Sequence, residues 1–475
     1  MYDLAVIGGG VVGGMILREL SKYQLKVCLL EKENDVAMGQ SKANSGIAHA
    51  GFDAAAGSLK AKFNLLGSKM MPEVTRELGV KYENNGSLVV AFSDEELATL
   101  EILKQRGEQN GVEGLEIIDR ERLRELEPNI SKNALGALHA KTGGIVCPYE
   151  LTIAAIGNAM DNGADLFCNF AVTKIEGGYP SYRIFAEDGQ VVEAKAIINC
   201  AGLGSQKIAN LVGDNSFTIG GRKGEYILLD HDPEFVHNTL FFTPTAKGKG
   251  ILVSRTVDNN ILLGPTAEEV EEDDRATTAV GQAAILKKAQ EMCENLPLGT
   301  KVTGFTGVRA YCDRHDFILE ESKAAKGFFH CAGIESPGLT SAPAIAKFVV
   351  EELVAKYFAL EKNPTFNPIR TPDYFFKNLS FEEKNALIQK EPAYGRMICR
   401  CEMVTEGEIL RAMRENPKAT DVDGVKRRVR AGMGRCQGGF CQPLVMELLA
   451  KEFGLAPNEI TKKGKGSELL VGKCK

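Results

Sequence analysis

The stretch Leu4-Ala5-Val6-Ile7-Gly8-Gly9-Gly10-Val11-Val12-Gly13 decides the fold of this chain. Its apolar start predicts a short strand buried in a parallel sheet. The glycines fit G-x-G-x-x-G, and an amphipathic helix is predicted from Val11 to about Lys22. A second strand is predicted from Lys26 to Glu31. Strand, glycine turn, helix and strand together predict a dinucleotide-binding unit.

Each part of this pattern has a physical role. Gly8 allows the tight turn, Gly10 lets a pyrophosphate approach the backbone, and Gly13 lets the helix pack closely on the strand. The phosphates then meet free N–H groups at the positive end of the helix. The carboxylate of Glu31 can accept a hydrogen bond from a ribose hydroxyl. The alternative is a purely structural glycine turn.

The composition is that of an ordinary globular protein. The chain has 475 residues, of which 44% are apolar and 25% charged, and this length predicts two or three domains. A net charge of −6 argues against a general nucleic-acid binder. No apolar run approaches the ~18–20 residues that cross a bilayer, and no signal-peptide pattern precedes the first strand. We therefore expect a cytoplasmic protein with no direct membrane insertion, membrane association being open only through a partner.

Three further segments extend the pattern. A loop of small and polar residues, Gly39–Phe52, follows the second strand, Asn199–Gly202 ends a buried strand, and Ala332–Thr340 forms the turn of a late strand-turn-helix. With Gly143-Gly144 and Gly224-Glu225-Tyr226, these segments resemble the D-amino-acid-oxidase-like family of FAD enzymes over about residues 1–360.

This resemblance implies FAD as a cofactor. The N-terminal glycines would hold its ADP part, and the N-terminus of the late helix would lie near the flavin. The implied cofactor-binding residues are Gly8, Gly10, Gly13, Glu31, Ser41, Asn44, Ser45, Gly46, Ala201, Gly202, Gly333, Gly338, Leu339 and Thr340.

Two close cysteine pairs, Cys399/Cys401 and Cys436/Cys441, lie near the C-terminus. Their C-x-C and C-x4-C spacings supply four thiolates, enough for one iron–sulfur cluster, although four thiolates also suit zinc. The segment resembles the bacterioferritin-associated-ferredoxin-like [2Fe-2S] fold, which implies all four as iron ligands. Arg427, Arg428 and Arg430 nearby either bind an anion or the charge of the cluster, or form a solvated basic face. The other eight cysteines, Cys28, Cys147, Cys168, Cys200, Cys293, Cys312, Cys331 and Cys474, are predicted to be buried or idle thiols.

The expected fold class is α/β, with a Rossmann-type FAD-binding domain, an inserted β-rich α+β substrate domain and a small helical C-terminal [2Fe-2S] domain. The expected oxidoreductase region is 1–370, the linker 371–395, the [2Fe-2S] domain 396–455 and the tail 456–475. Within the first region, FAD binding is expected roughly at 1–75, 140–215 and 325–360. The substrate domain is expected roughly at 76–139 and 216–324.

Oxidation of an alcohol or amine on a flavin needs a base and, for an anionic substrate, cations. His49 lies in the loop expected along the flavin and is the preferred catalytic residue, with His315 second. Arg309, Lys223 and Arg255 are candidates to bind an anionic group of the substrate. For each, the alternative is a structural or surface role.

The whole chain resembles the FAD subunits of anaerobic glycerol-3-phosphate dehydrogenases, which join the same two modules. This implies oxidation of a small anionic hydroxy substrate, sn-glycerol 3-phosphate, to dihydroxyacetone phosphate. Electrons would leave through the cluster to a partner flavoprotein or a quinone-linked subunit.

The substrate stays open at this point. The segment from Asn44 to Ala61 resembles L-2-hydroxyglutarate oxidases more closely, and Phe52-Asp53-Ala54 stands where glycerol-3-phosphate enzymes often carry Arg and Tyr. The alternatives are therefore a 2-hydroxy acid dehydrogenase or oxidase, an amine or imino-acid oxidase, and an electron-transfer subunit whose flavin meets no organic substrate.

Overall fold

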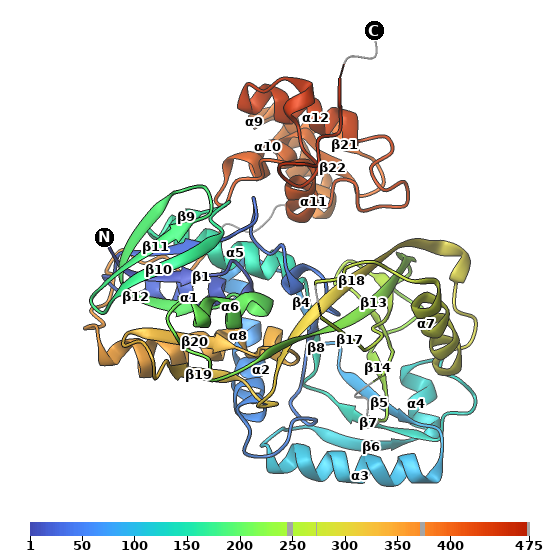
Figure 1. Cartoon of the computed structure of the whole chain (residues 1–475). Helices are drawn as coiled ribbons and strands as arrows, with labels where there is room; N and C mark the ends of the chain where they lie inside the picture. The colour runs from blue at the N-terminus through green and yellow to red at the C-terminus, as the bar shows by residue number, and fades with distance from the viewer. Residues whose placement is uncertain (245–249, 272, 371–375, 473–475) are drawn as a thin grey trace.

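The computed structural model describes residues 1–244, 250–271, 273–370 and 376–472. Cys474 and residues 371–375 of the expected linker lie outside these ranges. The chain forms three parts: a parallel-sheet part that holds the N-terminus, a mixed-sheet part, and a C-terminal module (Figure 1). The expected α/β fold class, with a separate small C-terminal domain, is confirmed.

The first part is built on a sheet of eight strands with a parallel centre. Its parallel strands run in the order β9, β2, β1, β12 and β20. The strands are β1 (Tyr2–Ile7), β2 (Val27–Leu30), β9 (Asp165–Phe167), β10 (Val172–Gly178), β11 (Ser181–Ala186), β12 (Val191–Asn199), β19 (Ile318–Glu321) and β20 (Phe328–Ala332). Strand β19, within the range expected for the substrate domain, pairs with β20 in this sheet.

Helices cover one face of this sheet with a continuous apolar core. Helix α1 (Val11–Ser21) packs beside α5 (Pro148–Asp161) and α8 (Gly338–Phe348), and α8 also packs against α2 (Leu59–Leu78). The close fit of α1 explains Gly13: a Cβ added there would lie 2.1 Å from the carbonyl oxygen of Gly8. The glycine pattern therefore sets how closely the helix approaches the turn.

The second part is a sheet of nine strands, most of them antiparallel. Long strands β13 (Ile219–His231) and β18 (Lys301–Cys312) pair along their whole length. The other strands are β5 (Ser87–Ala91), β6 (Leu115–Asp119), β7 (Gly136–Ala140), β14 (Thr239–Phe242), β15 (Leu252–Arg255), β16 (Asn260–Gly264) and β17 (Glu268–Val270), with helices α3 (Asp94–Gln109), α4 (Arg120–Leu126) and α7 (Ala279–Met292). A small sheet of β3 (Ile47–Ala48), β8 (Gly144–Val146) and β4 (Tyr82–Glu83) lies between the two parts.

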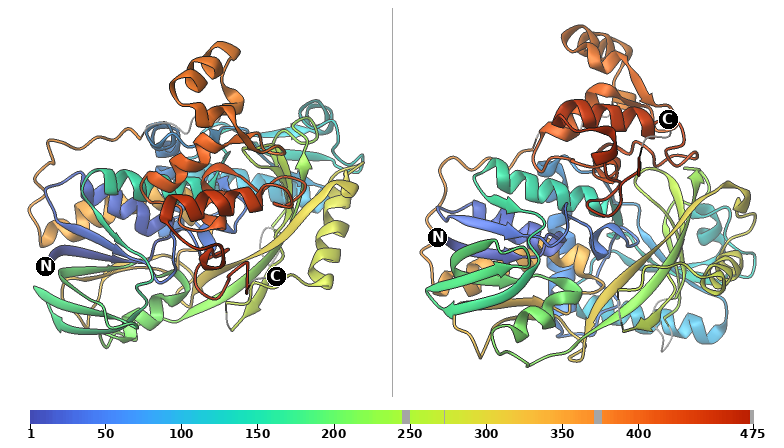
Figure 2. Two further views of the ribbon diagram at one scale, coloured as in Figure 1. Left: turned by 90° about the horizontal axis from the view of Figure 1, so that it is seen from above. Right: turned by 45° about the horizontal axis from the view of Figure 1, so that its top comes forward.

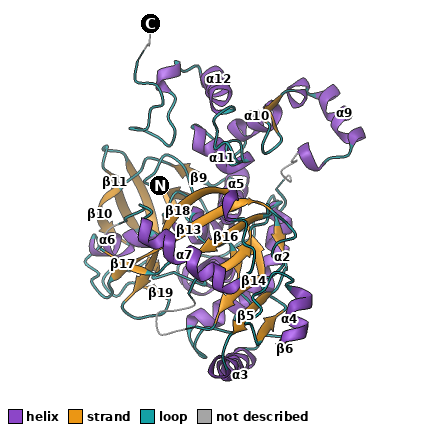
Figure 3. Ribbon diagram, turned by 90° about the vertical axis from the view of Figure 1, so that its right-hand side faces the viewer, coloured by secondary structure: helices purple, strands orange, loops and turns teal. Residues whose placement is uncertain are grey.

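The C-terminal module has its own apolar core and is mostly helical (Figure 3). It contains α9 (Phe381–Lys390), β21 (Met397–Cys399), β22 (Val404–Thr405), α10 (Glu406–Arg414), α11 (Val422–Val429) and α12 (Gln442–Phe453). In both views of Figure 2 the module lies on top of the other two parts.

Buried ion pairs fasten the module to the parallel-sheet part. Arg428 Nη2 lies 2.9 Å from Asp35 Oδ1, and Arg427 Nη2 lies 2.5 Å from Asp35 Oδ2. All three side chains are at most 7% exposed. Arg427 and Arg428, which the sequence left as an anion site or a solvated basic face, are therefore docking residues, because a carboxylate of the first part is their counter-charge. Arg430 pairs instead with Glu402 of the module and Asp258 of the mixed-sheet part.

The segment before the module also lies against the first part. Arg18 donates to the carbonyl of Pro368 at 3.2 Å, Asn158 to that of Asn367 at 3.0 Å, and the Arg370 N–H to that of Glu77 at 2.9 Å. Residues 361–370 therefore form a strap held along α1, α2 and α5. None of the helices in the described ranges has both the length and the apolarity to cross a membrane.

Candidate functional site

A cavity of about 380 Å³ opens beside the glycine turn. Six of the predicted cofactor residues line it: Gly8, Gly10, Glu31, Ser41, Ala201 and Gly202. At Gly8 the backbone has φ +112°, and a Cβ would lie 2.4 Å from the carbonyl oxygen of Cys200. Only glycine fits this turn, which leaves the backbone open to the cavity.

Two side chains shape this cavity by bonding its backbone. The Gly9 N–H donates to Glu31 Oε2 at 2.6 Å, and the Val11 N–H, at the start of α1, donates to Ser41 Oγ at 2.9 Å. Burial raises the pKa of Glu31, although the N–H groups of Glu33 and Gly9 act to lower it. A carboxylate and a hydroxyl at a helix N-terminus are suited to hold the ribose and phosphates of a dinucleotide.

Lysine 42 and Arg275 add positive charge to this cavity, and the sequence reading did not single out either of them. Burial, together with the nearby charges of Arg427 and Arg275, lowers the pKa of Lys42 to about 8. A site that already holds several cations at close quarters favours an anionic ligand such as a pyrophosphate.

A second cavity of about 360 Å³ adjoins the first. The two share Val11, Gln40 and Ser41 as lining residues, so together they form one elongated space. Of the predicted residues, Asn44, Ser45, His49, Arg309, Gly338 and Leu339 line the second cavity. An extended cofactor with its ADP end at the glycine turn would place its other end here, at the N-terminus of α8.

Three contacts fix His49 at the wall of the second cavity. Its backbone N–H donates to Thr340 Oγ1 at 2.9 Å, and its carbonyl accepts from Asn64 Nδ2 at 2.6 Å. Its ring Nε2 lies 3.2 Å from Ser336 Oγ. Thr340, predicted to touch the cofactor, holds the backbone of His49 and is not among the described residues that line the two cavities.

Two arginines face the second cavity from neighbouring strands. Arg309 on β18 and Arg222 on β13 are paired in the register of the two strands, and Arg309 donates to the carbonyl of Thr266 at 3.2 Å. Lys60 also lines the cavity and lies 3.0 Å from Glu335, which Arg222 approaches at 3.5 Å. Three cations, against the carboxylates of Glu335 and Asp53, suit an anionic substrate.

Two predicted anion-binding residues lie elsewhere. Lys223 is 3% exposed and lies 2.7 Å from Asp274, and Arg255 pairs with Glu83 and Asn259. Neither is among the residues that line the two cavities. Arg222, which the sequence reading missed, lines the cavity because alternate residues of a strand face opposite sides. Arg222 lies four residues before Tyr226, so in a strand the two side chains face the same side. Because Tyr226 also lines the cavity, this alternation was the sequence signal available for Arg222.

The other predicted residues that line neither cavity are Gly13, Gly46 and Gly333. Gly46 has φ +66°, and a Cβ there would lie 2.7 Å from the carbonyl oxygen of Val146. Gly333, with φ +64°, would bring a Cβ within 2.8 Å of the Cys312 sulfur. These glycines shape the loops that carry the lining residues. His315 also lines neither cavity.

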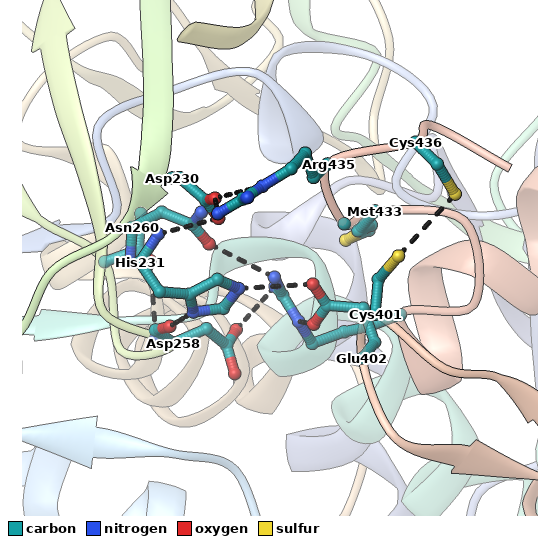
Figure 4. Close-up of polar contacts among 12 residues, drawn as sticks. Asp230, His231, Asp258, Asn260, Cys401, Glu402, Met433, Arg435 and Cys436 are labelled. Carbon is teal, nitrogen blue, oxygen red and sulfur yellow. Dashed lines mark hydrogen bonds and ion pairs between the residues drawn. The ribbon is translucent and has the colours of Figure 1, made fainter. Parts of the chain in front are cut away.

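The four clustered cysteines form two pairs in the module. The sulfurs of Cys401 and Cys436 lie 3.6 Å apart (Figure 4). The other two thiols, Cys399 and Cys441, interact with each other, and this interaction lowers the pKa of Cys399 and raises that of Cys441. Cys399 and Cys441 are buried, whereas Cys401 is exposed.

Backbone N–H groups point at these sulfurs. Burial acts to raise the pKa of Cys436, but N–H groups of residues 438–440 and the Cys401 thiol lower it overall. Thiolates arranged as two pairs with N–H donors suit a centre of two irons. Within the described ranges, no three His, Cys, Asp or Glu side chains gather as ligands of a single metal ion.

Comparison with known proteins identifies two families in this chain. The family described as FAD dependent oxidoreductase matches residues 3–352, and the BFD-like [2Fe-2S] binding domain matches residues 397–451. A glycerol 3-phosphate dehydrogenase of Caloramator mitchellensis is 48% identical over 100% of this chain and 99% of that protein.

Two further relatives cover the first two parts. A structure of an L-alpha-glycerophosphate oxidase from Mycoplasma pneumoniae with FAD bound has a TM-score of 0.74 and 31% identity, covering 78% of this chain and 98% of the other. A mitochondrial L-2-hydroxyglutarate dehydrogenase of Caenorhabditis elegans is 30% identical over 75% of this chain and 94% of that protein.

Proposed function

Because this chain belongs to the FAD dependent oxidoreductase family, we propose that it oxidises sn-glycerol 3-phosphate to dihydroxyacetone phosphate. Its cofactors are FAD and, in the BFD-like domain, a [2Fe-2S] cluster rather than zinc. One observation carries the choice of substrate: a relative similar over the whole length, C-terminal module included, is a glycerol 3-phosphate dehydrogenase.

The lining residues have distinct roles in this proposal. Arg222 and Arg309 bind the phosphate of the substrate, since two guanidinium groups on neighbouring strands can donate to several phosphate oxygens. His49, fixed by Thr340, Asn64 and Ser336, accepts the proton of the hydroxyl that becomes a carbonyl. The flavin supplies the acceptor for the hydride of the same carbon.

The FAD would lie along the joined cavities. Gly8, Gly10, Glu31, Ser41, Ala201 and Gly202 would hold its ADP part, with Gly13 supporting the turn. Asn44, Ser45, Gly338 and Leu339 would contact its flavin end, and Gly46, Gly333 and Thr340 would shape that end. Lys223 and Arg255 have no role in this proposal, because their charges are already paired outside the cavities.

Cys399, Cys401, Cys436 and Cys441 would hold the cluster, which passes electrons onward one at a time. The acceptor would be a partner flavoprotein or a quinone-linked subunit. We place the protein in the cytoplasm, with membrane association only through that partner. In this proposal the expected boundaries change in two places: β19 extends the FAD-binding part back to residue 318, and α9, expected in the linker, belongs to the module.

A second candidate is the oxidation of L-2-hydroxyglutarate. The relative from Caenorhabditis elegans carries that activity in its name, and Phe52 makes part of the second cavity apolar. The same arginine pair could bind a carboxylate in place of a phosphate.

The two candidates are separated by mixing the purified holoenzyme with each substrate in the absence of oxygen. We expect sn-glycerol 3-phosphate to bleach the visible absorption band of the flavin within the dead time of the mixing instrument or shortly after it. L-2-hydroxyglutarate should leave this band unchanged. The reverse result would replace the first proposal by the second. Reduction by neither compound, but by a reduced protein donor, would support a pure electron carrier.

A further inference from the structure

The C-terminal module touches the FAD-binding part through a contact that involves Tyr149, Met433 and Arg430. The Tyr149 hydroxyl lies 3.5 Å from Met433 Sδ, and Arg430 Nη1 lies 3.5 Å from the same hydroxyl. We call these three residues the junction. Burial raises the pKa of Tyr149, so its hydroxyl stays protonated and can serve as a donor to the sulfur.

On one side, the junction leads back to the second cavity. Asn44 and Ser45 line that cavity, and Gly46 follows them in the chain. The Val146 N–H donates to the carbonyl of Gly46 at 2.7 Å, and β3 pairs with β8 at this point. Strand β8 continues through Cys147 into α5, where Tyr149 is the second residue. Covalent bonds and one short hydrogen bond therefore connect the cavity wall to Tyr149.

On the other side, the junction leads to the cysteines. Met433 belongs to the turn from Arg430 to Gly434, which immediately precedes Arg435 and Cys436. In the same turn a Cβ added at Gly434 would lie only 2.4 Å from Cys401 Cβ, so the turn packs against this cysteine. Figure 4 shows Met433 on the same side as the pair of Cys401 and Cys436. The turn that meets Tyr149 thus also contacts the exposed cysteine pair.

Arg430 holds this turn in place from three sides. Its guanidinium lies 2.8 Å from Glu402 of the module, 2.7 Å from Asp258 and 3.2 Å from Asn260 of the mixed-sheet part. The side chain is 6% exposed. Its backbone has φ +65°, at a helix C-cap where glycine is usual and a non-glycine residue is strained. The arginine adopts this unfavourable backbone while its side chain makes these three bonds, which points to a role for the side chain.

We propose that the junction is the internal passage for electrons from the flavin to the [2Fe-2S] cluster, with Arg430 as its positioning residue. This inference rests on the proposed function. Oxidation of the substrate alcohol releases two electrons and two protons. The electrons cross the junction singly to the cluster and then reduce the external one-electron or two-electron acceptor. The protons go to His49 and to solvent near the flavin, so only electrons cross.

The small contact between Tyr149 and Met433 can control the rate of electron transfer. Electron tunnelling weakens steeply with distance, and more steeply across an empty gap than through bonds or packed atoms. Among the described residues, Tyr149 and Met433 bring the module against the helix that follows the wall of the second cavity. Removing the Met433 side chain opens a gap there, and removing Arg430 lets the turn shift.

The test follows two signals in the holoenzyme without oxygen. Stopped-flow absorbance reports flavin reduction by sn-glycerol 3-phosphate, and freeze-quench electron paramagnetic resonance reports cluster reduction. The variants are Met433→Ala, Tyr149→Phe and Arg430→Gln, each with FAD and iron contents equal to those of the unaltered protein. We expect flavin reduction at the unaltered rate in all of them. Cluster reduction should slow severalfold in Tyr149→Phe and more strongly in Met433→Ala and Arg430→Gln.

The matched control is Arg435→Gln. Arg435 lies in the same segment and pairs with Asp230 of the mixed-sheet part at 2.7 Å. Its side chain is exposed, however, and its described bonds go to Asp230 and not to Tyr149. We expect unaltered rates for both signals. Arg430→Lys, which restores the charge, should recover part of the rate of cluster reduction.

The outcomes separate this inference from the proposed function. Any compound that reduces the flavin, L-2-hydroxyglutarate included, loads electrons in the same way, so the junction can be tested even if glycerol 3-phosphate is not the substrate. Cluster reduction at the unaltered rate in both Met433→Ala and Tyr149→Phe, after either way of loading, would overturn the passage. Equal slowing in the Arg435→Gln control would overturn it as well, because the effect would then reflect docking in general.

Discussion

At the scale of single residues, the phase of strand β13 decides which cation lines the second cavity. Arg222 faces the second cavity with its cross-strand neighbour Arg309, whereas Lys223 faces the opposite side and pairs with Asp274. A shift of one residue along a strand reverses the face of every side chain. The cavity therefore receives two planar guanidinium groups, which suit an oxyanion better than the point charge of a lysine.

We predict that Arg309→Gln lowers kcat/KM for sn-glycerol 3-phosphate by about ten- to a hundredfold, because a hydrogen bond to a charged group contributes about 1.5–3 kcal/mol. Arg222→Gln should behave alike. Lys223→Gln is the matched control, since its side chain lies outside the cavity, and its kcat/KM should change little. Steady-state kinetics with an artificial acceptor measures all three. A larger loss in Lys223→Gln than in Arg309→Gln would show that the assigned faces are wrong.

A second prediction concerns Glu31. Replacement by alanine leaves the buried Gly9 N–H without its acceptor and removes the expected partner of the ribose. FAD affinity should fall by about 1–3 kcal/mol, which is roughly five- to a hundredfold in the dissociation constant. Titration of the flavin-free protein, followed by protein or flavin fluorescence, measures it. Unchanged affinity would remove Glu31 from the FAD site.

The sequence could predict some of these residues and not others. Gly8, Gly10 and Glu31 belong to one continuous unit of strand, turn and strand, so local pattern was enough to place them at the first cavity. Arg222 and Lys223 are neighbours in the chain, and a choice between them needs the orientation of β13, which the sequence reading did not fix. The position of Arg255 outside the cavities could not be predicted either, since its partner Glu83 is distant in sequence.

At the scale of elements, the crossing of α2 and α8 supports His49 from both sides. Asn64 on α2 bonds the His49 carbonyl, and Thr340 on α8 bonds its N–H. The two helices come close because α2 carries Gly67 at the crossing, where a Cβ would lie 2.0 Å from the carbonyl oxygen of Thr340. Sequence periodicity predicts such helices but not their closest point of approach, which depends on how distant segments pack.

We therefore predict that Gly67→Ala forces α2 and α8 apart. Overpacking of this kind costs about 1–3 kcal/mol of stability. Because it also displaces Thr340, flavin reduction by substrate should slow. Thermal unfolding and anaerobic stopped-flow absorbance are the measurements. Gly178→Ala is the control, since a Cβ there meets no atom within 4 Å, and it should alter neither quantity. Normal flavin reduction in Gly67→Ala would mean that the crossing does not position His49.

At the scale of the whole molecule, the docking of the module depends on charges far apart in sequence. Asp35 lies directly after the first βαβ unit, yet its partners Arg427 and Arg428 lie on α11. The composition of the C-terminal segment was enough to predict a separate [2Fe-2S] domain. The position where the module docks was not predictable, because a run of arginines looks the same in the sequence whether it faces water, an anion or a buried carboxylate.

The fourth prediction is that Asp35→Asn destabilises the docked module by about 3–5 kcal/mol, because two buried arginines lose their counter-charge. Burial acts to raise the pKa of Asp35, but Arg428 and Arg427 hold it at about 2. This lies below the usual value near 3.9, so the stabilisation is complete above about pH 5 and is lost as the pH falls towards 2. The difference in melting temperature between the two proteins should thus be constant from pH 5 to 8 and shrink in more acidic buffer. A difference that grew on acidification would contradict the assignment.

The strap of residues 361–370 has a consequence for how the protein meets its acceptor. The strap is bound to α1, α2 and α5, and buried ion pairs dock the module. The iron–sulfur domain is therefore held in one position and does not move between the flavin and the acceptor. Delivery inside the chain should then be unimolecular and indifferent to solvent viscosity. The external acceptor must diffuse to the module, so only its collision rate should fall when the solvent viscosity is raised.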